Sequence, residues 1–163
     1  MNRIGDNLHH SGSNEEVVKA LVKCDAEFIL IGGLAVSWYC SSRQADDMDI
    51  LVNPTEENSL KVSNALCSLS VPINGFEKDS FSKDGVQASI KQHYYADIIT
   101  PAKGGLTYEE IMIGSVIGNI FNIPINIPSI ENLIKLKEST VASEEKEISK
   151  HQEDLRLLKN VLR

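Results

Sequence analysis

The first part of the chain shows apolar positions at helical spacing. The stripe over residues 17–22 repeats every three to four positions, and Ser13 followed by Glu16 is typical of a capping box. The sequence therefore predicts a first helix that begins at Ser13 and ends near Asp25. Residues 1–12 lack such a pattern and are expected to form a flexible leader.

Two shorter stretches have the length and pattern of strands. Residues 28–31 (FILI) are wholly apolar, which at this length favours a buried strand over a helix. In residues 47–52 (DMDILV), period two places Asp47 and Asp49 on one face and Met48, Ile50 and Val52 on the other. Between them, Gly32 and Gly33 are followed by residues 34–39, which we expect to be the start of a short helix.

The same criteria divide the rest of the chain. A helix is predicted over 56–69, capped at Thr55, with an apolar face toward a sheet formed by Leu60, Ala65, Leu66 and Leu69. Strands are expected from Phe76 to Ile99 with a hairpin at Asp84-Gly85, and short strands from Thr107 to Ile127, the last an edge strand containing Pro124. A helix from Glu131, capped at Ser129, and a final helix after a charged, mobile link over 143–150 complete the chain.

Composition narrows the class of protein. A chain of 163 residues fits one domain, which we assign to residues 13–163. A net charge of −7 argues against broad electrostatic capture of nucleic acid, although a local basic groove is compatible with it. No apolar run approaches the roughly 18 residues of a membrane span. Three cysteines without metal-type spacing favour reduced thiols and a cytoplasmic protein that does not bind membranes.

Candidate chemistry gathers around residues 32–49. Asp47 and Asp49 repel each other and are costly to desolvate on an otherwise apolar strand, and a divalent cation such as Mg²⁺ or Mn²⁺ commonly explains such a pair. Gly32 and Gly33 lie between a strand and a helix, where close backbone approach and free N–H groups suit phosphate. The combination indicates metal-assisted chemistry on a nucleoside triphosphate.

These residues resemble a known family. The order of Gly32-Gly33, a short helix, Arg43 and the D-x-D pair is similar to the signature of the nucleotidyltransferase superfamily with the polymerase-β-type palm. The fuller patterns GGLA (32–35) and RQADDMD (43–49) look most like the AbiEii-type toxin and minimal nucleotidyltransferase branch. Ala45 stands where that branch usually has Thr. The resemblance implies an α/β (α+β) nucleotidyltransferase fold, with a small mixed sheet, flanking helices and a helical C-terminal segment.

Three further positions extend the resemblance. Asp97, before two aliphatic residues, matches the family's third carboxylate, but an Asp capping the turn at 101–104 is the alternative. Lys137 matches a family lysine on the helix after Ser129, and Asp154 matches an acid in the terminal run, where we expect it to pair with a cation. Arg43 either reaches the triphosphate, braces an aspartate or lies at the surface. The resemblance thus implies Asp47, Asp49 and Asp97 as catalytic metal ligands, and Gly32, Gly33, Arg43 and Lys137 as the nucleotide-binding group.

The resemblance also implies an enzyme. It would move a nucleoside monophosphate from an NTP to an acceptor hydroxyl on tRNA or protein, as a toxin with an antitoxin partner. An antibiotic nucleotidyltransferase of the aminoglycoside or lincosamide type, acting on a small molecule, is the first alternative. A catalytically silent, antitoxin-like binding protein is the second. We assign none of the four histidines to chemistry.

Overall fold

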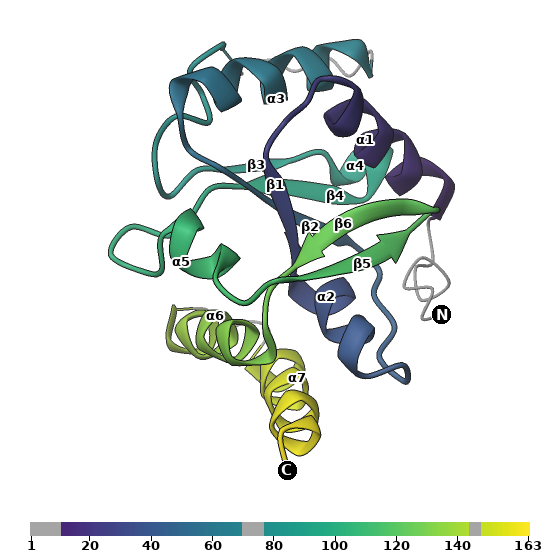
Figure 1. Cartoon of the computed structure of the whole chain (residues 1–163), viewed down its shortest axis with the longest axis vertical. Coiled ribbons are helices and arrows are strands. Elements are labelled where there is room, and N and C mark those ends of the chain that lie inside the picture. Colours follow the sequence, from purple (N-terminus) through teal and green to yellow (C-terminus); the bar gives the residue numbers. More distant parts are fainter. Residues whose placement is uncertain (1–10, 70–76, 144–147) are drawn as a thin grey trace.

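The computed structural model describes residues 11–69, 77–143 and 148–163, which form a mixed sheet, a β-hairpin and surrounding helices (Figure 1). The helices are α1 (Ser11–Lys23), α2 (Gly32–Tyr39), α3 (Glu56–Ser68), α4 (Lys91–Tyr94), α5 (Tyr108–Met112), α6 (Ile130–Ser143) and α7 (Ile148–Val161). The strands are β1 (Phe28–Ile31), β2 (Met48–Val52), β3 (Gln87–Ser89), β4 (Ala96–Ile99), β5 (Val116–Ile120) and β6 (Ile123–Ile127).

The sheet has the strand order β1-β2-β4-β3. β2 is antiparallel to β1 and parallel to β4, and β3 closes the other edge antiparallel to β4. In the parallel pair, Asp49 lies directly opposite Asp97. The hairpin of β5 and β6 packs beside β1. The α/β class and the small mixed sheet expected from the sequence are therefore confirmed.

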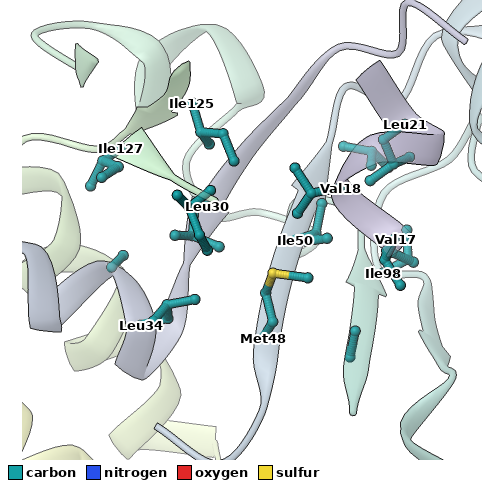
Figure 2. Close-up of a cluster of buried hydrophobic side chains, with 14 of the residues drawn as sticks. Val17, Val18, Leu21, Leu30, Leu34, Met48, Ile50, Ile98, Ile125 and Ile127 are labelled. Carbon is teal, nitrogen blue, oxygen red and sulfur yellow. The ribbon is translucent and has the colours of Figure 1, made fainter. Parts of the chain in front are cut away.

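One face of the sheet is wholly apolar and forms the main core. The side chains of Met48, Ile50 and Val52 on β2 are fully buried, as period two in the sequence requires. Helices α1 and α3 cover this face, and Figure 2 shows Val17, Val18 and Leu21 of α1 directed toward it. The cluster also takes in these residues of α2, β1, β4 and β6: Leu30, Leu34, Ile98, Ile125 and Ile127.

The opposite face is divided between apolar and acidic residues. Ile29 and Leu51 pack against Tyr108 and Ile111, so that α5 covers one part of this face. Asp49 and Asp97 alternate with the core residues of their strands and therefore lie on this second face. The sheet thus separates a dry core from a face that can carry charged chemistry.

Local capping signals place several helices as expected. Thr55 Oγ1 accepts a hydrogen bond from Asn58 N over 3.1 Å at the start of α3. Ser129 Oγ accepts one from Asn132 N over 3.2 Å at the start of α6. Helix α1 begins at Ser11, ahead of the Ser13 start that we expected and inside the assigned leader. The remainder of that leader, residues 1–10, lies outside the described residues, as does the middle of the expected link at 144–147.

The predicted hairpin at Asp84-Gly85 is wrong. Residues on its first side form turns rather than a strand, and the predicted strand start at Phe76 lies outside the described residues. Local hydrogen bonds explain the difference, because Glu77 N donates to Ser80 Oγ and Ser82 Oγ donates to the Asp79 carbonyl. Phe81 is fully buried and holds this loop against the core instead of extending it.

Three smaller expectations also need correction. The strand predicted from Tyr94 begins only at Ala96, because Tyr95 has a left-handed backbone with φ 51° that ends α4. The strand region predicted from Thr107 opens instead with helix α5, whose start is a complete capping box between Thr107 and Glu110. On α3, Leu60 is 39% exposed, and Val62 takes the buried place.

No helix among the described residues is both long and apolar enough to cross a membrane.

Candidate active site

A cleft of about 300 Å³ opens on the acidic face of the sheet. Strand ends, the start of α2 and the pair α6–α7 surround it. We call it the central cleft; its lining residues are Ile31, Gly32, Gly33, Arg43, Ala45, Asp46, Asp47, Asp49, Gln87, Lys91, Asp97, Ile99, Leu133, Leu136, Lys137, Thr140, Lys150 and His151.

Asp97 lies at the floor of the cleft. Its side chain is only 3% exposed, and Oδ2 accepts hydrogen-bonding contacts from Gln87 Nε2 at 3.3 Å and Lys91 Nζ at 3.2 Å. Its second oxygen, Oδ1, is buried and has no hydrogen-bond partner among the described residues. The side chain makes no described contact with the turn at 101–104. A buried carboxylate oxygen without a partner is costly, and it suits a cation or a hydroxyl donor.

Asp49 lies beside Asp97 on the neighbouring strand. Burial, followed by the negative charge of Asp97, raises the pKa of Asp49 to about 6 against the opposing charges of Lys137 and Lys91. The two acids lie side by side in parallel strands, so the charge of Asp97 disfavours the ionised form of Asp49. A centre that gathers negative charge in this way has a strong electrostatic preference for cations.

Lys91 on α4 bridges two of the acids. Its Nζ lies 3.2 Å from Asp47 Oδ2 and 3.2 Å from Asp97 Oδ2. Partial burial lowers the pKa of Lys91, but the charges and hydrogen bonds of Asp97 and Asp47 outweigh it and raise the pKa to about 12. The ammonium group is therefore protonated at neutral pH.

The two glycines let backbone and side chains approach at the start of α2. Gly32 has φ +71°, and a Cβ there would collide with the Asp49 carboxylate. A Cβ on Gly33 would overlap the guanidinium of Arg43. Because the glycines lack a Cβ, the side chains of Asp49 and Arg43 can lie against the first turn of α2. The N–H groups of that turn are available to an anion.

Asp154 on α7 joins the two cations on the other side of the cleft. Its Oδ1 lies 2.5 Å from Arg43 Nε, and its Oδ2 lies 2.8 Å from Lys137 Nζ. Lys137 Nζ also lies 3.3 Å from His151 Nδ1. Burial alone would raise the pKa of Asp154, but the hydrogen bond from Arg43 and the charge of Lys137 hold it below its usual value.

The chain is similar to known proteins in its structure and not in its sequence. Neither a protein-family model nor a curated protein sequence matches the chain. A solved structure of ANT(2")-Ia in complex with adenylyl-2"-tobramycin is similar with a TM-score of 0.61 and 16% identity, over 91% of this chain and 87% of that one. An antigenic nucleotidyltransferase-like protein from Paracoccidioides brasiliensis is similar with a TM-score of 0.53 and 13% identity, over 91% and 75%.

The chain has a nucleotidyltransferase fold.

This likeness shows the fold that the motif resemblance implies, and it does not distinguish the AbiEii-type branch. At identities this low, likeness between structures carries the fold alone. What the nucleotidyltransferase fold does in this chain has to be argued from the site.

The nucleotidyltransferase fold brings every residue of the expected site to one cleft. All seven line it: Asp47, Asp49, Asp97, Gly32, Gly33, Arg43 and Lys137. Asp154 pairs with cations, as expected from the sequence, and Arg43 braces an aspartate, although that aspartate is Asp154. Asp46 is exposed at the rim of the cleft, away from the buried core residues.

Sequence reasoning missed Lys91, Gln87 and His151, which also line the cleft. Lys91 and Gln87 carry no sequence signal, because the short helix α4 and the β3 edge that place them follow from tertiary packing. His151 had a signal: it precedes Asp154 by three residues on one helix, and such pairs share a face.

The donor set fits a divalent cation of the kind that nucleotidyltransferases use. Asp47, Asp49 and Asp97 offer hard oxygen ligands, and Asp97 Oδ1 is buried without a partner among the described residues. In this conformation no three carboxylate, imidazole or thiol side chains of the described chain lie close enough together to hold a metal ion. In the same conformation Lys91 Nζ contacts one oxygen of Asp47 and one oxygen of Asp97.

Proposed function

We propose that the protein is a metal-dependent nucleotidyltransferase that moves a nucleoside monophosphate from an NTP to an acceptor hydroxyl. The observation that carries this proposal is the register of the parallel strands. Asp49 and Asp97 are directly paired, and both line a cleft that also receives the glycine-bounded start of α2. An acidic centre beside a phosphate-binding helix end is what transfer at a phosphorus atom requires.

Asp47, Asp49 and Asp97 would hold one or two Mg²⁺ or Mn²⁺ ions. Such ions supply polarisation of the phosphate oxygens and acidification of a coordinated hydroxyl. The three acids come from one strand end and its parallel neighbour, so that the sheet fixes their spacing.

The cations and the helix start would hold the triphosphate. Gly32 and Gly33 expose backbone N–H groups at the first turn of α2, and Arg43 and Lys137 are held at the cleft by Asp154. Because both cations already share one anion, their positions are set before a nucleotide arrives. This preorganisation favours the charge that develops on departing pyrophosphate.

Asp97 would orient the acceptor. Its Oδ1 is the buried atom that can take a hydrogen bond from the attacking hydroxyl. The acceptor oxygen then bonds to the α-phosphorus, the bond to pyrophosphate breaks, and the hydroxyl proton leaves through the carboxylate to solvent.

The acceptor follows from the motif resemblance, and we propose tRNA or protein, as in a toxin paired with an antitoxin. One observation favours a second candidate. ANT(2")-Ia was solved with adenylyl-2"-tobramycin, and its fold covers 91% of this chain, so that a drug hydroxyl is the alternative acceptor.

The test is transfer of label. The purified protein is incubated with each α-³²P-labelled NTP, Mg²⁺ and a cell extract, and separately with tobramycin and a lincosamide. The matched control is Asp49→Asn. Label in RNA or protein that needs Asp49 supports the toxin-like enzyme, and label on a drug supports the alternative. Absence of label with every NTP and acceptor would contradict an enzyme and favour the silent binding protein.

A further inference from the structure

We propose that Lys91 is an internal counter-ion of the acidic centre, which a divalent cation must displace in order to bind between Asp47 and Asp97. This inference rests on the proposed function, since it concerns the same three acids. It adds a residue that sets the affinity for the cation and that no sequence motif indicates.

The position of the ammonium group is the first argument. Lys91 Nζ lies 3.2 Å from one oxygen of Asp47 and 3.2 Å from one oxygen of Asp97. A metal ion bridging those two carboxylates would need the same space and would meet the same oxygens. Two cations at one such position repel strongly, so that binding of the metal and retention of both ion pairs exclude each other.

The backbone that carries Lys91 is fixed, which is the second argument. Asn14 Nδ2 donates to the carbonyl oxygens of Tyr94 at 2.6 Å and Tyr95 at 3.1 Å, tying the end of α4 to α1. Tyr94 Oη donates to the carbonyl of Leu69 at 2.6 Å. Tyr95 O accepts from Met48 N, which ties the same turn to β2. A loop so held does not open to release the lysine.

The side chain itself has room to leave, which is the third argument. The side chain of Lys91 is 47% exposed, whereas that of Asp97, its partner at the floor, is 3% exposed. Rotation of a flexible four-carbon stem therefore carries the ammonium group to solvent while the acids stay in place. The exchange is one cation for another at a fixed pair of carboxylates.

The chain offers a matched control for charge. Lys150 on α7 also lines the central cleft, but it makes no ion pair with Asp47 or Asp97 among the described contacts. Lys150→Met removes the same charge from the same cleft without vacating the bridging position. A general change in the electrostatic potential of the cleft would affect both lysine variants alike.

The experiment measures Mn²⁺ binding without nucleotide, by titration calorimetry and by the electron paramagnetic resonance signal of free Mn²⁺. We expect Lys91→Met to bind Mn²⁺ about tenfold more tightly than the wild type or better, and Lys150→Met to bind within about threefold of it. Lys91→Arg, which keeps the charge and pairs with carboxylates through two nitrogens, should bind Mn²⁺ no more tightly than the wild type.

A second readout is thermal stability. Lys91→Met should melt at a lower temperature than the wild type without metal, because the acids lose their counter-ion, and saturating Mn²⁺ should raise its Tm by more. Equal tightening by both methionine variants, or weaker Mn²⁺ binding by Lys91→Met, overturns the role of Lys91 and leaves the proposed function standing. If no variant and no wild type binds Mn²⁺, both the counter-ion and the metal-dependent function are overturned.

Discussion

Asp97 is the residue on which sequence and structure converge most closely. Its carboxylate faces the same cleft as Asp47 and Asp49, and its contacts are with Gln87 and Lys91. We expect Asp97→Asn to lower the rate of transfer by about 10²–10⁴-fold, since the attacking hydroxyl loses its acceptor. Binding of the NTP should be largely retained. Single-turnover kinetics and equilibrium binding of a fluorescent NTP separate these two effects.

A purely structural role for Asp97 predicts a different result. Asn keeps an oxygen that can accept from Gln87 Nε2 and Lys91 Nζ, so the substitution would then affect stability and leave transfer unchanged. Transfer near the wild-type rate in Asp97→Asn would contradict its place in the reaction.

A substitution at Gly32 would show whether the cleft tolerates one additional atom, the Cβ of alanine. Gly32 and Gly104 both have positive φ, +71° and +75°, but a Cβ on Gly104 would meet nothing within 4 Å. Alanine at either position therefore carries a similar backbone strain of about 1–2 kcal/mol. At Gly32 the new methyl group must also move the Asp49 carboxylate.

We expect Gly32→Ala to lose more stability than Gly104→Ala in urea denaturation and to lose NTP-dependent stabilisation by Mn²⁺ as well. Gly104→Ala should keep that response. The same loss in both variants would show that backbone strain alone is responsible and that Gly32 has no particular relation to Asp49.

Helices α6 and α7 belong to the site because of one buried anion. Asp154 is fully buried and pairs with Arg43, from the segment before β2, and with Lys137 of α6. Removing its charge leaves two poorly solvated cations facing each other. We expect Asp154→Asn to lower the free energy of unfolding by about 3–5 kcal/mol at pH 7, measured by urea denaturation. Glu153→Gln, which removes an exposed neighbouring acid, should change it only marginally.

The effect should depend on pH in a definite direction. The pKa of Asp154 is held below its usual value, so its contribution to stability is complete above the pKa of the unfolded chain and is lost as the pH falls through the folded value. The difference between wild type and Asp154→Asn should therefore be constant near neutral pH and shrink below about pH 4. A difference that grew on acidification would contradict the ion-pair assignment.

Elements with strong local signals were predictable, and those set by distant contacts were not. Thr55 and Ser129 cap their helices as the sequence indicates, and β2 alternates as its pattern requires. The Asp84-Gly85 hairpin failed because buried Phe81 holds the preceding loop against the core. Helix α5 shows the opposite case, since its T-x-x-E capping box is a local signal in the sequence, where we expected short strands.

At the scale of the whole molecule, binding of a metal ion and a nucleotide in the cleft should affect the thermal stability of the fold. A ligand that binds only the folded state raises Tm by mass action, so Mn²⁺ with an NTP should stabilise the wild type. Asp49→Asn should abolish that rise, while without ligand it should be at least as stable, since repulsion from Asp97 is relieved. Differential scanning fluorimetry measures both. Asp84→Asn, in an exposed turn, is the control; equal ligand-induced shifts in all three proteins would contradict the site.

The sequence predicted the acids and glycines of the site because they lie on two strands, just before one of them (Asp47) and at a helix start, all with clear patterns. It did not predict Lys91, whose place depends on the contacts of α4 with α1 and α3. The sequence therefore does not predict how positive and negative side chains are paired inside the cleft.

The ion pairs of Asp154 also have a consequence for the order of events during synthesis. A ribosome produces α7 after every other described element, and all the lining residues of the cleft except Lys150 and His151 precede α7 in the chain. The N-terminal part of a chain emerges first during synthesis. Arg43 and Lys137 therefore meet their shared anion only when α7 leaves the exit tunnel. A nascent chain that ends before α7 has the acids of the centre but lacks the anion that positions Arg43 and Lys137.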